Sequence, residues 1–201
     1  APSVSTPNLM PGDSYVFRTT YTTSDWTGEL ARYMMDPFTG AISTVPDWSS
    51  QAKLDAKAAA SRTIYVFDGS VAGTKLKAFT AANFGSNSYF NTPHISTAPS
   101  GLTQYLCAST DTCLSSADQT NAAGSALVNY LRGDRTNEGA LLDNTKYYRQ
   151  RQHVLGDMVN SQVAYVSKPL NSYGDPGYTD FVTSKASRKA MVYIGANDCM
   201  P

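Results

Sequence analysis

The stretch WTGELARYMMDPFTGAISTVPDW, residues 26–48, decides the fold prediction because it joins two apolar segments through a turn. Residues Gly28–Met35 predict a strand, and the apolar segment after the turn leads to Trp48. Between them, the Asp36 carboxylate can cap the turn and Gly40 can take a positive φ. Trp48 can fill the space between neighbouring sheets. The stretch predicts an antiparallel hairpin with a core tryptophan.

The rest of the chain predicts a mainly β fold with inserted helices. Further strands are expected at Tyr15–Tyr21, Arg62–Phe67, Lys75–Phe79, Val163–Val166 and Met191–Gly195, and helices at Ser50–Ala60 and Thr120–Leu131. The last two strands are mostly apolar, as is typical of strands buried on both faces. Because 201 residues suit one ordinary domain, we expect residues 1–201 to form a single domain.

Charge and hydropathy exclude some classes of partner. Sixteen basic and sixteen acidic residues cancel, and no stretch concentrates like charges, so we expect no binding to nucleic acid or to membrane surfaces. The start, Ala1–Val4, lacks the basic head and apolar stretch of a signal peptide, and no run is long enough for a membrane span. We therefore expect the chain to be soluble as given.

Residues 83–118 are rich in Asn, Ser, Thr, Pro and Gly, which predicts a long decorated loop. Cys107 and Cys113 lie within it, and their close spacing favours a small disulfide-closed loop in an oxidising compartment. Two unpaired loop cysteines are the alternative, and Cys199 is left over. A metal site is not expected, because neither His94 nor His153 has the spacing of a zinc finger.

A longer pattern occupies residues 149–198, RQRQHVLGDMVNSQVAYVSKPLNSYGDPGYTDFVTSKASRKAMVYIGAND. Its pieces are Arg149-x-Arg151, Val154-Leu155-Gly156-Asp157, Val159-Asn160-Ser161, Asp175-Pro176-Gly177-Tyr178 with Phe181, Ser187-Arg188-Lys189, and Val192-Tyr193-x-Gly195-Ala196-Asn197-Asp198. Upstream, Asp25-Trp26-x-Gly28 and Leu131-Arg132-Gly133-Asp134 fit the same pattern. Together they resemble the N-terminal part of the C-terminal propeller domain of the PilY/PilC family, which comprises type IV pilus biogenesis factors and tip adhesins.

The resemblance implies a fold, a role and a location. The fold would be a partial β-propeller of the quinoprotein-like type, since 201 residues cannot close a ring of seven or eight blades. The role would be non-enzymatic, in pilus assembly, retraction control and host-cell adhesion, with minor pilins as partners. The location would be extracellular, at the outer membrane surface or pilus tip of a Gram-negative bacterium. Family members continue past Asn-Asp with Gly-Met-Leu-His-Ala-Phe, whereas Cys199-Met200-Pro201 follows here.

The tripeptide Arg132-Gly133-Asp134 is the candidate receptor-binding site, because some extracellular proteins bind integrins through these three residues. Its structural alternative is a left-handed helix cap at Gly133, with local ion pairs made by Arg132 and Asp134. The resembled family binds calcium further downstream. Here Asp134–Gly139 is the nearest approach to a calcium loop, and its oxygens have the wrong spacing. We expect no metal or cofactor in this chain.

Two alternative functions remain open. A quinoprotein-type dehydrogenase would need cofactor-stacking tryptophans and adjacent cysteines, and the chain has two tryptophans and no adjacent cysteines. A structural pilus or phage component could assemble by strand addition. If the propeller fragment stands alone, a partner chain, a second copy or a compact rearrangement should cover the apolar edge around Val192–Ile194. Arg149 and Arg151 are expected to share a strand face and to pair with carboxylates of the next blade, and His153 is expected to be a buried, hydrogen-bonded residue rather than a catalytic base.

Overall fold

The computed structural model describes residues 3–4, 14–24, 27–87, 89–90, 116–140, 143 and 145–196. Cys107, Cys113 and Cys199 lie outside these ranges, so their predicted states stay predictions. The chain divides into two compact units: unit 1 comprises Ala1–Asp55 and Leu155–Pro201, and unit 2 comprises Ala56–Val154. Whether they form one domain, as expected for residues 1–201, stays a prediction.

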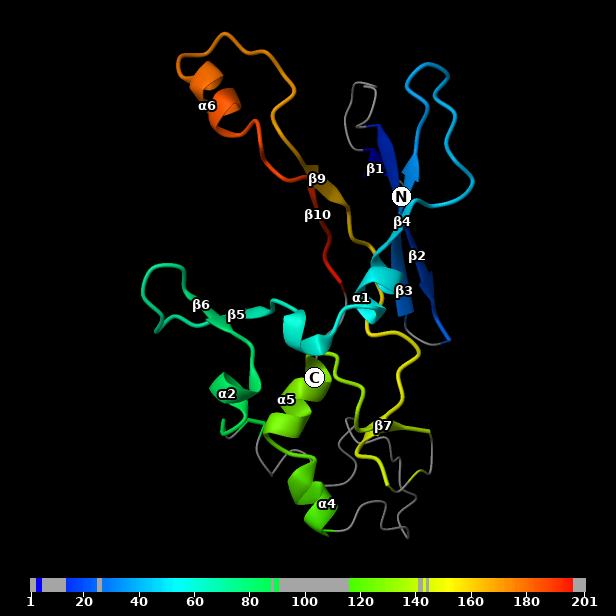
Figure 1. Cartoon of the computed structure of the whole chain (residues 1–201), viewed down its shortest axis with the longest axis vertical. Coiled ribbons are helices and arrows are strands. Elements are labelled where there is room, and N and C mark those ends of the chain that lie inside the picture. The colour runs from blue at the N-terminus through cyan, green and yellow to red at the C-terminus, as the bar shows by residue number, and fades with distance from the viewer. Residues whose placement is uncertain are drawn as a thin grey trace. The chain divides into compact units, whose positions relative to one another are not determined.

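Unit 1 contains a four-stranded antiparallel sheet in the order β1-β2-β3-β4 (Figure 1). Its strands are β1 (Ser3–Val4), β2 (Tyr15–Thr22), β3 (Thr27–Met34) and β4 (Trp48–Ser49), and helix α1 (Ser50–Asp55) follows. Strands β2 and β3 carry β-branched and aromatic residues that favour the pleated conformation. They pair along their full lengths, from Tyr15 opposite Met34 to Thr22 opposite Thr27.

The turn after β3 has the predicted chemistry. Asp36 Oδ1 accepts hydrogen bonds from the backbone N–H groups of Phe38 and Thr39, at 2.8 and 3.1 Å. Gly40 has a φ of 72°, a left-handed conformation that glycine adopts without strain. Trp48 pairs with β3 and packs against the core cluster of unit 1. An antiparallel hairpin at residues 26–48 is therefore confirmed for its described part, whereas its place in a propeller blade stays a prediction.

The C-terminal half of unit 1 is a two-stranded antiparallel ribbon. Strand β9 (Ala164–Val166) pairs with β10 (Met191–Tyr193), and helix α6 (Tyr178–Ser184) lies in the connection (Figure 1). Both strands were predicted from the sequence, whereas helix α6 was not. The inner side chains Tyr165 and Val192 pack against a core of Phe17, Leu30, Met158 and Val163.

Unit 2 contains short elements around a small core. They are the 3-10 helix η1 (Ala59–Ser61), the antiparallel ribbon β5 (Tyr65–Phe67) and β6 (Leu76–Ala78), helices α2 (Ala81–Phe84), α4 (Ser116–Asn121) and α5 (Ser125–Leu131), and the parallel pair β7 (Glu138–Gly139) and β8 (Tyr148–Arg149). The core cluster is Ala122, Ala123, Leu127, Tyr130 and Tyr148.

Two helices differ from their predicted extents. The predicted helix Ser50–Ala60 ends at Asp55 and continues only as the separate 3-10 helix η1. The predicted helix Thr120–Leu131 is two helices, because Gly124 has a φ of 62° and a Cβ there would lie 2.6 Å from the Gly85 carbonyl oxygen. Close backbone packing thus overrides the helix propensity around Gly124.

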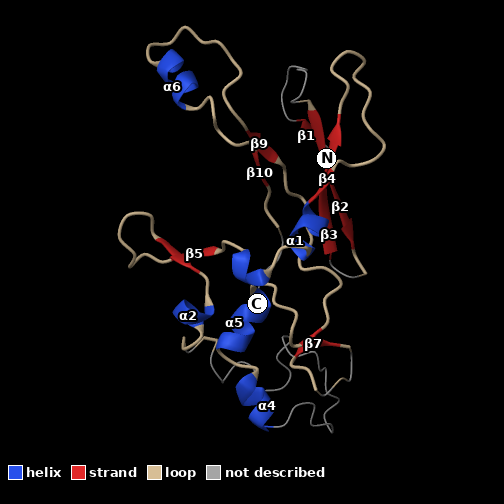
Figure 2. Cartoon of the chain, viewed as in Figure 1, coloured by secondary structure: helices blue, strands red, loops and turns tan. Residues whose placement is uncertain are grey.

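The sheets are small and mostly antiparallel, and short helices alternate with the strands along the chain (Figure 2), so the predicted mainly β class with inserted helices is confirmed. The loop expected at residues 83–118 overlaps α2 and α4 at its ends, and most of its centre lies outside the described residues. No helix in the described ranges is both long enough and apolar enough to cross a membrane.

Candidate functional site

Helix α5 ends at the tripeptide Arg132-Gly133-Asp134. Gly133 has a φ of 96°, and its N–H donates to the Tyr130 carbonyl at 2.8 Å. The N–H of Asp134 donates to the Asn129 carbonyl at 2.9 Å. These two bonds close the last helical turn, an arrangement that favours glycine at the left-handed position. The structural alternative for Gly133, a left-handed helix cap, is confirmed.

Arg132 is buried within unit 2, with 8% of its surface exposed. Its guanidinium donates to the carbonyl oxygens of Phe79, Ala59 and Arg62, the last two at 3.2 and 3.1 Å. Arg62, equally buried, donates from Nη1 to the Arg132 carbonyl at 2.9 Å. The expected ion pair at Arg132 is thus replaced by bonds to carbonyl oxygens, which link α5 to η1 and to the segment after β6.

The burial of Arg132 bears on receptor binding. An integrin-type receptor would need the guanidinium of Arg132 and the carboxylate of Asp134 to face solvent together. In this conformation the guanidinium faces carbonyl oxygens of its own unit. Receptor binding through Arg132-Gly133-Asp134 stays a prediction, and it would require a buried cation to leave its hydrogen bonds.

Asp134 holds the turn that follows α5. Its Oδ1 accepts hydrogen bonds from Thr136 Oγ1 at 2.6 Å and from the Thr136 N–H at 2.9 Å. These bonds, that from the hydroxyl first, lower the pKa of the Asp134 carboxyl below its ordinary value. The carboxylate is therefore ionised at neutral pH. Within the described part of the chain, no hydrogen bond reaches its second oxygen, Oδ2.

Glu138 is a buried carboxylate held by two arginines. Its side chain is 3% exposed and lies 2.5 Å from Arg151 Nη2 and 3.1 Å from Arg135 Nε. The Arg151 N–H adds a further bond at 3.1 Å. A buried carboxylate is tolerated when it is paired and hydrogen-bonded in this way. Arg151 thus pairs with a carboxylate, but this carboxylate lies 13 residues earlier within unit 2 and not in a next blade, and the Arg149 side chain is exposed.

The buried Glu138 carboxylate lies within Asp134–Gly139, the segment that comes nearest to a calcium-loop pattern. The Glu138 oxygens accept bonds from arginines, and Asp134 Oδ1 accepts bonds from Thr136. Among the described residues, no group of three or more His, Cys, Asp or Glu side chains gathers where it could hold a metal ion. The absence of a metal from the whole chain stays a prediction.

Two tyrosines stack beside this charged group. The rings of Tyr130 and Tyr148 have centroids 4.3 Å apart at an interplanar angle of 21°, and the Arg151 guanidinium carbon lies 4.0 Å from the Tyr130 centroid. The Tyr148 hydroxyl donates to the Ala122 carbonyl at 2.5 Å. Burial raises the pKa of both phenols above the ordinary value. The stack ties β8 to α5, and the hydroxyl bond ties it to the residue that follows α4.

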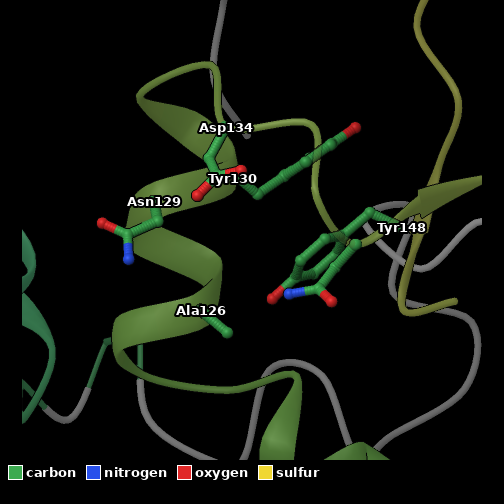
Figure 3. Close-up of a pocket in the computed structure, with 6 residues that line it drawn as sticks. Ala126, Asn129, Tyr130, Asp134 and Tyr148 are labelled. Atoms are coloured by element: carbon green, nitrogen blue, oxygen red, sulfur yellow. The ribbon is translucent and has the colours of Figure 1, made fainter. Parts of the chain in front are cut away.

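A cavity of about 260 Å³, which we call the tyrosine pocket, opens beside the stack. It is lined by Ala126, Asn129, Tyr130, Asp134, Asn137 and Tyr148. Figure 3 shows Asn129 and Tyr148 on opposite sides of the view, with Asp134 beside Tyr130 at the end of α5. The side-chain amides of Asn129 and Asn137 make no hydrogen bond within the described part of the chain. The pocket therefore presents polar groups that a ligand can bind.

Unit 1 brings several pieces of the 149–198 pattern together. Thr27 and Gly156 form an antiparallel bridge, and a Cβ on Gly28 would lie 2.6 Å from the Gly156 carbonyl oxygen. A Cβ on Gly195 would lie 3.2 Å from Ser161 Oγ. Glycine is thus required at residue 28 because two backbones meet there. Residues 25, 26, 197 and 198 of the pattern lie outside the described ranges.

The outer faces of both ribbons are apolar and exposed. On β9 and β10 the outward ribbon face carries Val166, Met191 and Tyr193, which are 39%, 50% and 51% exposed. On β5 and β6 the corresponding face carries Phe67 and Leu76 directly opposite each other, and Phe67 is 78% exposed. A solvated sheet face normally carries polar residues. These faces therefore have the composition of surfaces that another element covers.

Sequence reasoning missed three residues that organise unit 2: Arg62, Glu138 and Tyr148. Arg62 and Glu138 are buried charges, which a single sequence does not distinguish from exposed ones. The spacing of Arg135 and Glu138 was one available signal, but pairs at this spacing are common on helix surfaces. Tyr148 lies directly before the pattern of residues 149–198 and was not singled out for its packing.

Comparison with known proteins gives a consistent set of relatives. The chain is 31% identical over 186 residues to the type IV pilus biogenesis factor PilY1 of Pseudomonas aeruginosa strain UCBPP-PA14, covering 88% of this chain and 14% of that protein. It is 30% identical over 182 residues to a PilY1 homolog of Xylella fastidiosa, covering 87% and 11%. PilY1 of Pseudomonas aeruginosa strain PAK is 28% identical over 198 residues, covering 92% and 15%.

No family model matches the chain, and no solved structure matches it. The chain spans between 11% and 15% of the length of the PilY1 relatives described above. The match nevertheless extends over nearly all of this chain, from the sheet of unit 1 through unit 2 and back into unit 1.

Fold and site together define a β-rich chain whose distinctive residues serve close backbone packing and buried charge pairing. The comparisons identify the class further: the chain is a PilY1-family region, and the family predicted from residues 149–198 is confirmed. The named relatives are type IV pilus biogenesis factors.

Proposed function

We propose that the chain acts in type IV pilus biogenesis as a non-enzymatic, extracellular part of a PilY1-type protein. The observation that carries this proposal is the 31% identity to PilY1 over 88% of the chain. The contacts between Gly28 and residues 156–158 add support, because they place separate pieces of the family pattern side by side. Pilus assembly, retraction control and adhesion are the expected processes, and minor pilins are the expected partners.

The fold part of the proposal is a share of a larger quinoprotein-like β-propeller. In such a fold each sheet is covered on both faces by its neighbours. The outward ribbon face of Val166, Met191 and Tyr193 has the apolar composition that this packing requires, and it is exposed here. We infer that a neighbouring sheet covers this face. We thus propose a neighbouring sheet, rather than a partner chain or a second copy, as the element that covers the ribbon around residues 192–194.

Strand addition is the second candidate, and the β5–β6 ribbon favours it. A two-stranded ribbon is marginally stable in water without further pairing or packing. Phe67 is 78% exposed and Leu76, opposite it, is 46% exposed. A strand supplied by another part of the assembly would pair with the ribbon edge and reduce the exposure of these side chains.

The location and the remaining sites belong to the same proposal. We place the chain at the outer surface or pilus tip of a Gram-negative bacterium, where a Cys107–Cys113 disulfide can form. Binding of an integrin-type receptor through Arg132-Gly133-Asp134 is retained as a further element. Such binding requires Arg132 to break its hydrogen bonds to carbonyl oxygens of its own unit.

The test uses the full-length protein that contains this chain, expressed in cells lacking their own copy. Met191→Lys with Tyr193→Lys places two charges on the outward ribbon face, whereas Gln152→Lys places one at an exposed position outside the β9–β10 ribbon. We expect the double variant to reduce the number of surface pili at normal protein level, and Gln152→Lys to leave it unchanged. Normal piliation with the double variant would refute the packing role of this face.

A further inference from the structure

The connection between β9 and β10, residues 167–190, has no part in the proposed packing of the ribbon face. We call it the α6 lobe, and Figure 1 shows its helix beyond the end of the β9–β10 ribbon. No residue of the lobe is buried, so the lobe has no core of its own. Its aromatic and charged side chains are therefore all exposed or half-buried.

Three aromatic side chains of the lobe contact one another in sequence order. The ring centroids of Tyr173 and Tyr178 lie 5.0 Å apart, and those of Tyr178 and Phe181 lie 5.8 Å apart. These distances are typical of favourable ring pairs, so the rings hold one another in place. Tyr173 is 55% exposed and Phe181 is 41% exposed. The lobe thus offers an apolar surface that is formed before any partner binds.

The lobe also carries four basic side chains, Lys168, Lys185, Arg188 and Lys189. The guanidinium carbon of Arg188 lies 5.6 Å from the Phe181 ring centroid, and its Nη1 donates to the Ser167 carbonyl at 3.3 Å. Lys168 follows Ser167 and Lys189 follows Arg188, so this bond brings two exposed lysines to the base of the lobe. Like charges gathered in this way repel one another, and an anion relieves the repulsion.

The lobe has an excess of positive charge that the rest of the chain does not share. Its four basic residues and its two acidic residues, Asp175 and Asp180, give a net charge of +2, whereas the whole chain is neutral. Within the described residues, no charged side chain of the lobe forms an ion pair. A partner that supplies carboxylates is therefore attracted without breaking an existing ion pair.

Two features favour an acidic peptide over a uniform polyanion. Asp175 and Asp180 repel phosphates, and an excess of two charges is small for binding a nucleic acid or an anionic membrane. The exposed rings, in addition, are best covered by an apolar side chain. A peptide can present both groups, because a carboxylate and an aromatic ring can lie next to each other along it.

We propose that the α6 lobe binds an acidic peptide segment of another protein. Carboxylates of that segment pair with Lys168 and Lys189, and an aromatic side chain of the segment packs on Tyr173 and Phe181. This inference goes beyond the role in pilus biogenesis and does not depend on it.

The test is a titration of the purified 201-residue chain, observed by NMR of its backbone amides. The probe is a synthetic peptide of glutamates with one central phenylalanine. Two matched peptides replace the glutamates by glutamines or the phenylalanine by alanine. We expect saturable shifts of amides in residues 167–190 with the first peptide, and binding about tenfold weaker with either matched peptide. Vesicles of phosphatidylglycerol and an oligothymidylate are the polyanionic probes, and they should bind more weakly than the first peptide.

The variant Lys168→Gln with Lys189→Gln removes two charges, and neither lysine side chain makes a hydrogen bond or ion pair in the described ranges. It should weaken peptide binding by roughly three- to tenfold. The matched control, Lys53→Gln with Lys57→Gln, removes two exposed lysines outside the lobe and gives the chain the same net charge. It should bind the peptide as the unaltered chain does.

The proposal is overturned if the glutamate peptide does not bind, if the glutamine peptide binds equally well, or if the two double variants bind alike. It is also overturned if the vesicles or the oligothymidylate bind more tightly than the peptide, because the lobe would then bind polyanions rather than an acidic segment.

Discussion

Replacing Arg132 tests whether the tripeptide at the end of α5 is structural. Arg132→Leu removes a guanidinium that is 8% exposed and donates to the carbonyl oxygens of Phe79, Ala59 and Arg62. Leucine keeps part of the apolar stem but supplies no donor. Of these three carbonyl groups, those of Phe79 and Arg62 are buried. The substitution therefore leaves acceptors without partners in the interior of unit 2.

The magnitude follows from the number of acceptors left without donors. Each buried acceptor that loses its donor costs about 1 to 3 kcal/mol, and neighbouring losses are not fully additive. We expect Arg132→Leu to lower the free energy of unfolding of unit 2 by about 3 to 5 kcal/mol. That is a large part of the roughly 5 to 15 kcal/mol that stabilises an ordinary domain. Arg132→Lys keeps the charge but cannot span all three oxygens, so its cost should be smaller.

The assay is urea unfolding of the full chain, followed by tyrosine fluorescence and circular dichroism. The matched control is Arg149→Leu, which removes an exposed arginine side chain close in sequence to the same core. Its unfolding midpoint should change little, by about 0.5 kcal/mol or less in free energy. Integrin binding by each folded variant is measured in parallel on an immobilised receptor.

An unfolding midpoint for Arg132→Leu equal to that of the unaltered chain would refute the structural account of Arg132. So would a variant that loses receptor binding while its stability stays unchanged, because the guanidinium would then act in solvent. A lower unfolding midpoint for Arg132→Leu, together with an unchanged midpoint for Arg149→Leu, supports the account.

Two further predictions concern other positions. Gly28→Val should destabilise unit 1 by about 3 kcal/mol, because its Cβ would meet the Gly156 carbonyl oxygen at 2.6 Å, whereas Gly174→Ala, with open space around it, should unfold as the unaltered chain does. Burial raises the pKa of Tyr148, so its contribution to stability is fully present below about pH 10 and is lost as the pH rises above that value. Tyr148→Phe should flatten this alkaline decline in unfolding experiments, and an unchanged decline would contradict the buried environment of the phenol.

Local chemistry made the hairpin of residues 26–48 predictable from sequence. Asp36 caps its turn and Gly40 takes a positive φ within a few residues of each other, so no distant contact is needed to specify the turn. The strands of the β9–β10 ribbon were predictable from their apolar runs. Helix α6 was not, because Tyr178–Ser184 contains β-branched and aromatic residues and has no buried side chain to mark an apolar face.

The site was less predictable because its contacts are distant in sequence. Arg132 binds Phe79, 53 residues away, and Arg62, 70 residues away. A tripeptide pattern carries no information about such burial. The motif Arg132-Gly133-Asp134 was therefore visible in the sequence, but the buried position of the Arg132 guanidinium was not. The break at Gly124 has the same origin, since the backbone of Gly85 approaches it from outside the helix. The family, by contrast, was evident from short motifs alone.

The central proposal is that this chain acts in type IV pilus biogenesis. It is tested most directly by counting surface pili by electron microscopy in cells whose full-length protein lacks residues 14–196, compared with cells that carry the intact protein at the same level. The account predicts that pili are lost or greatly reduced without this region and are restored by the intact protein. Equal numbers of pili in both strains would contradict it.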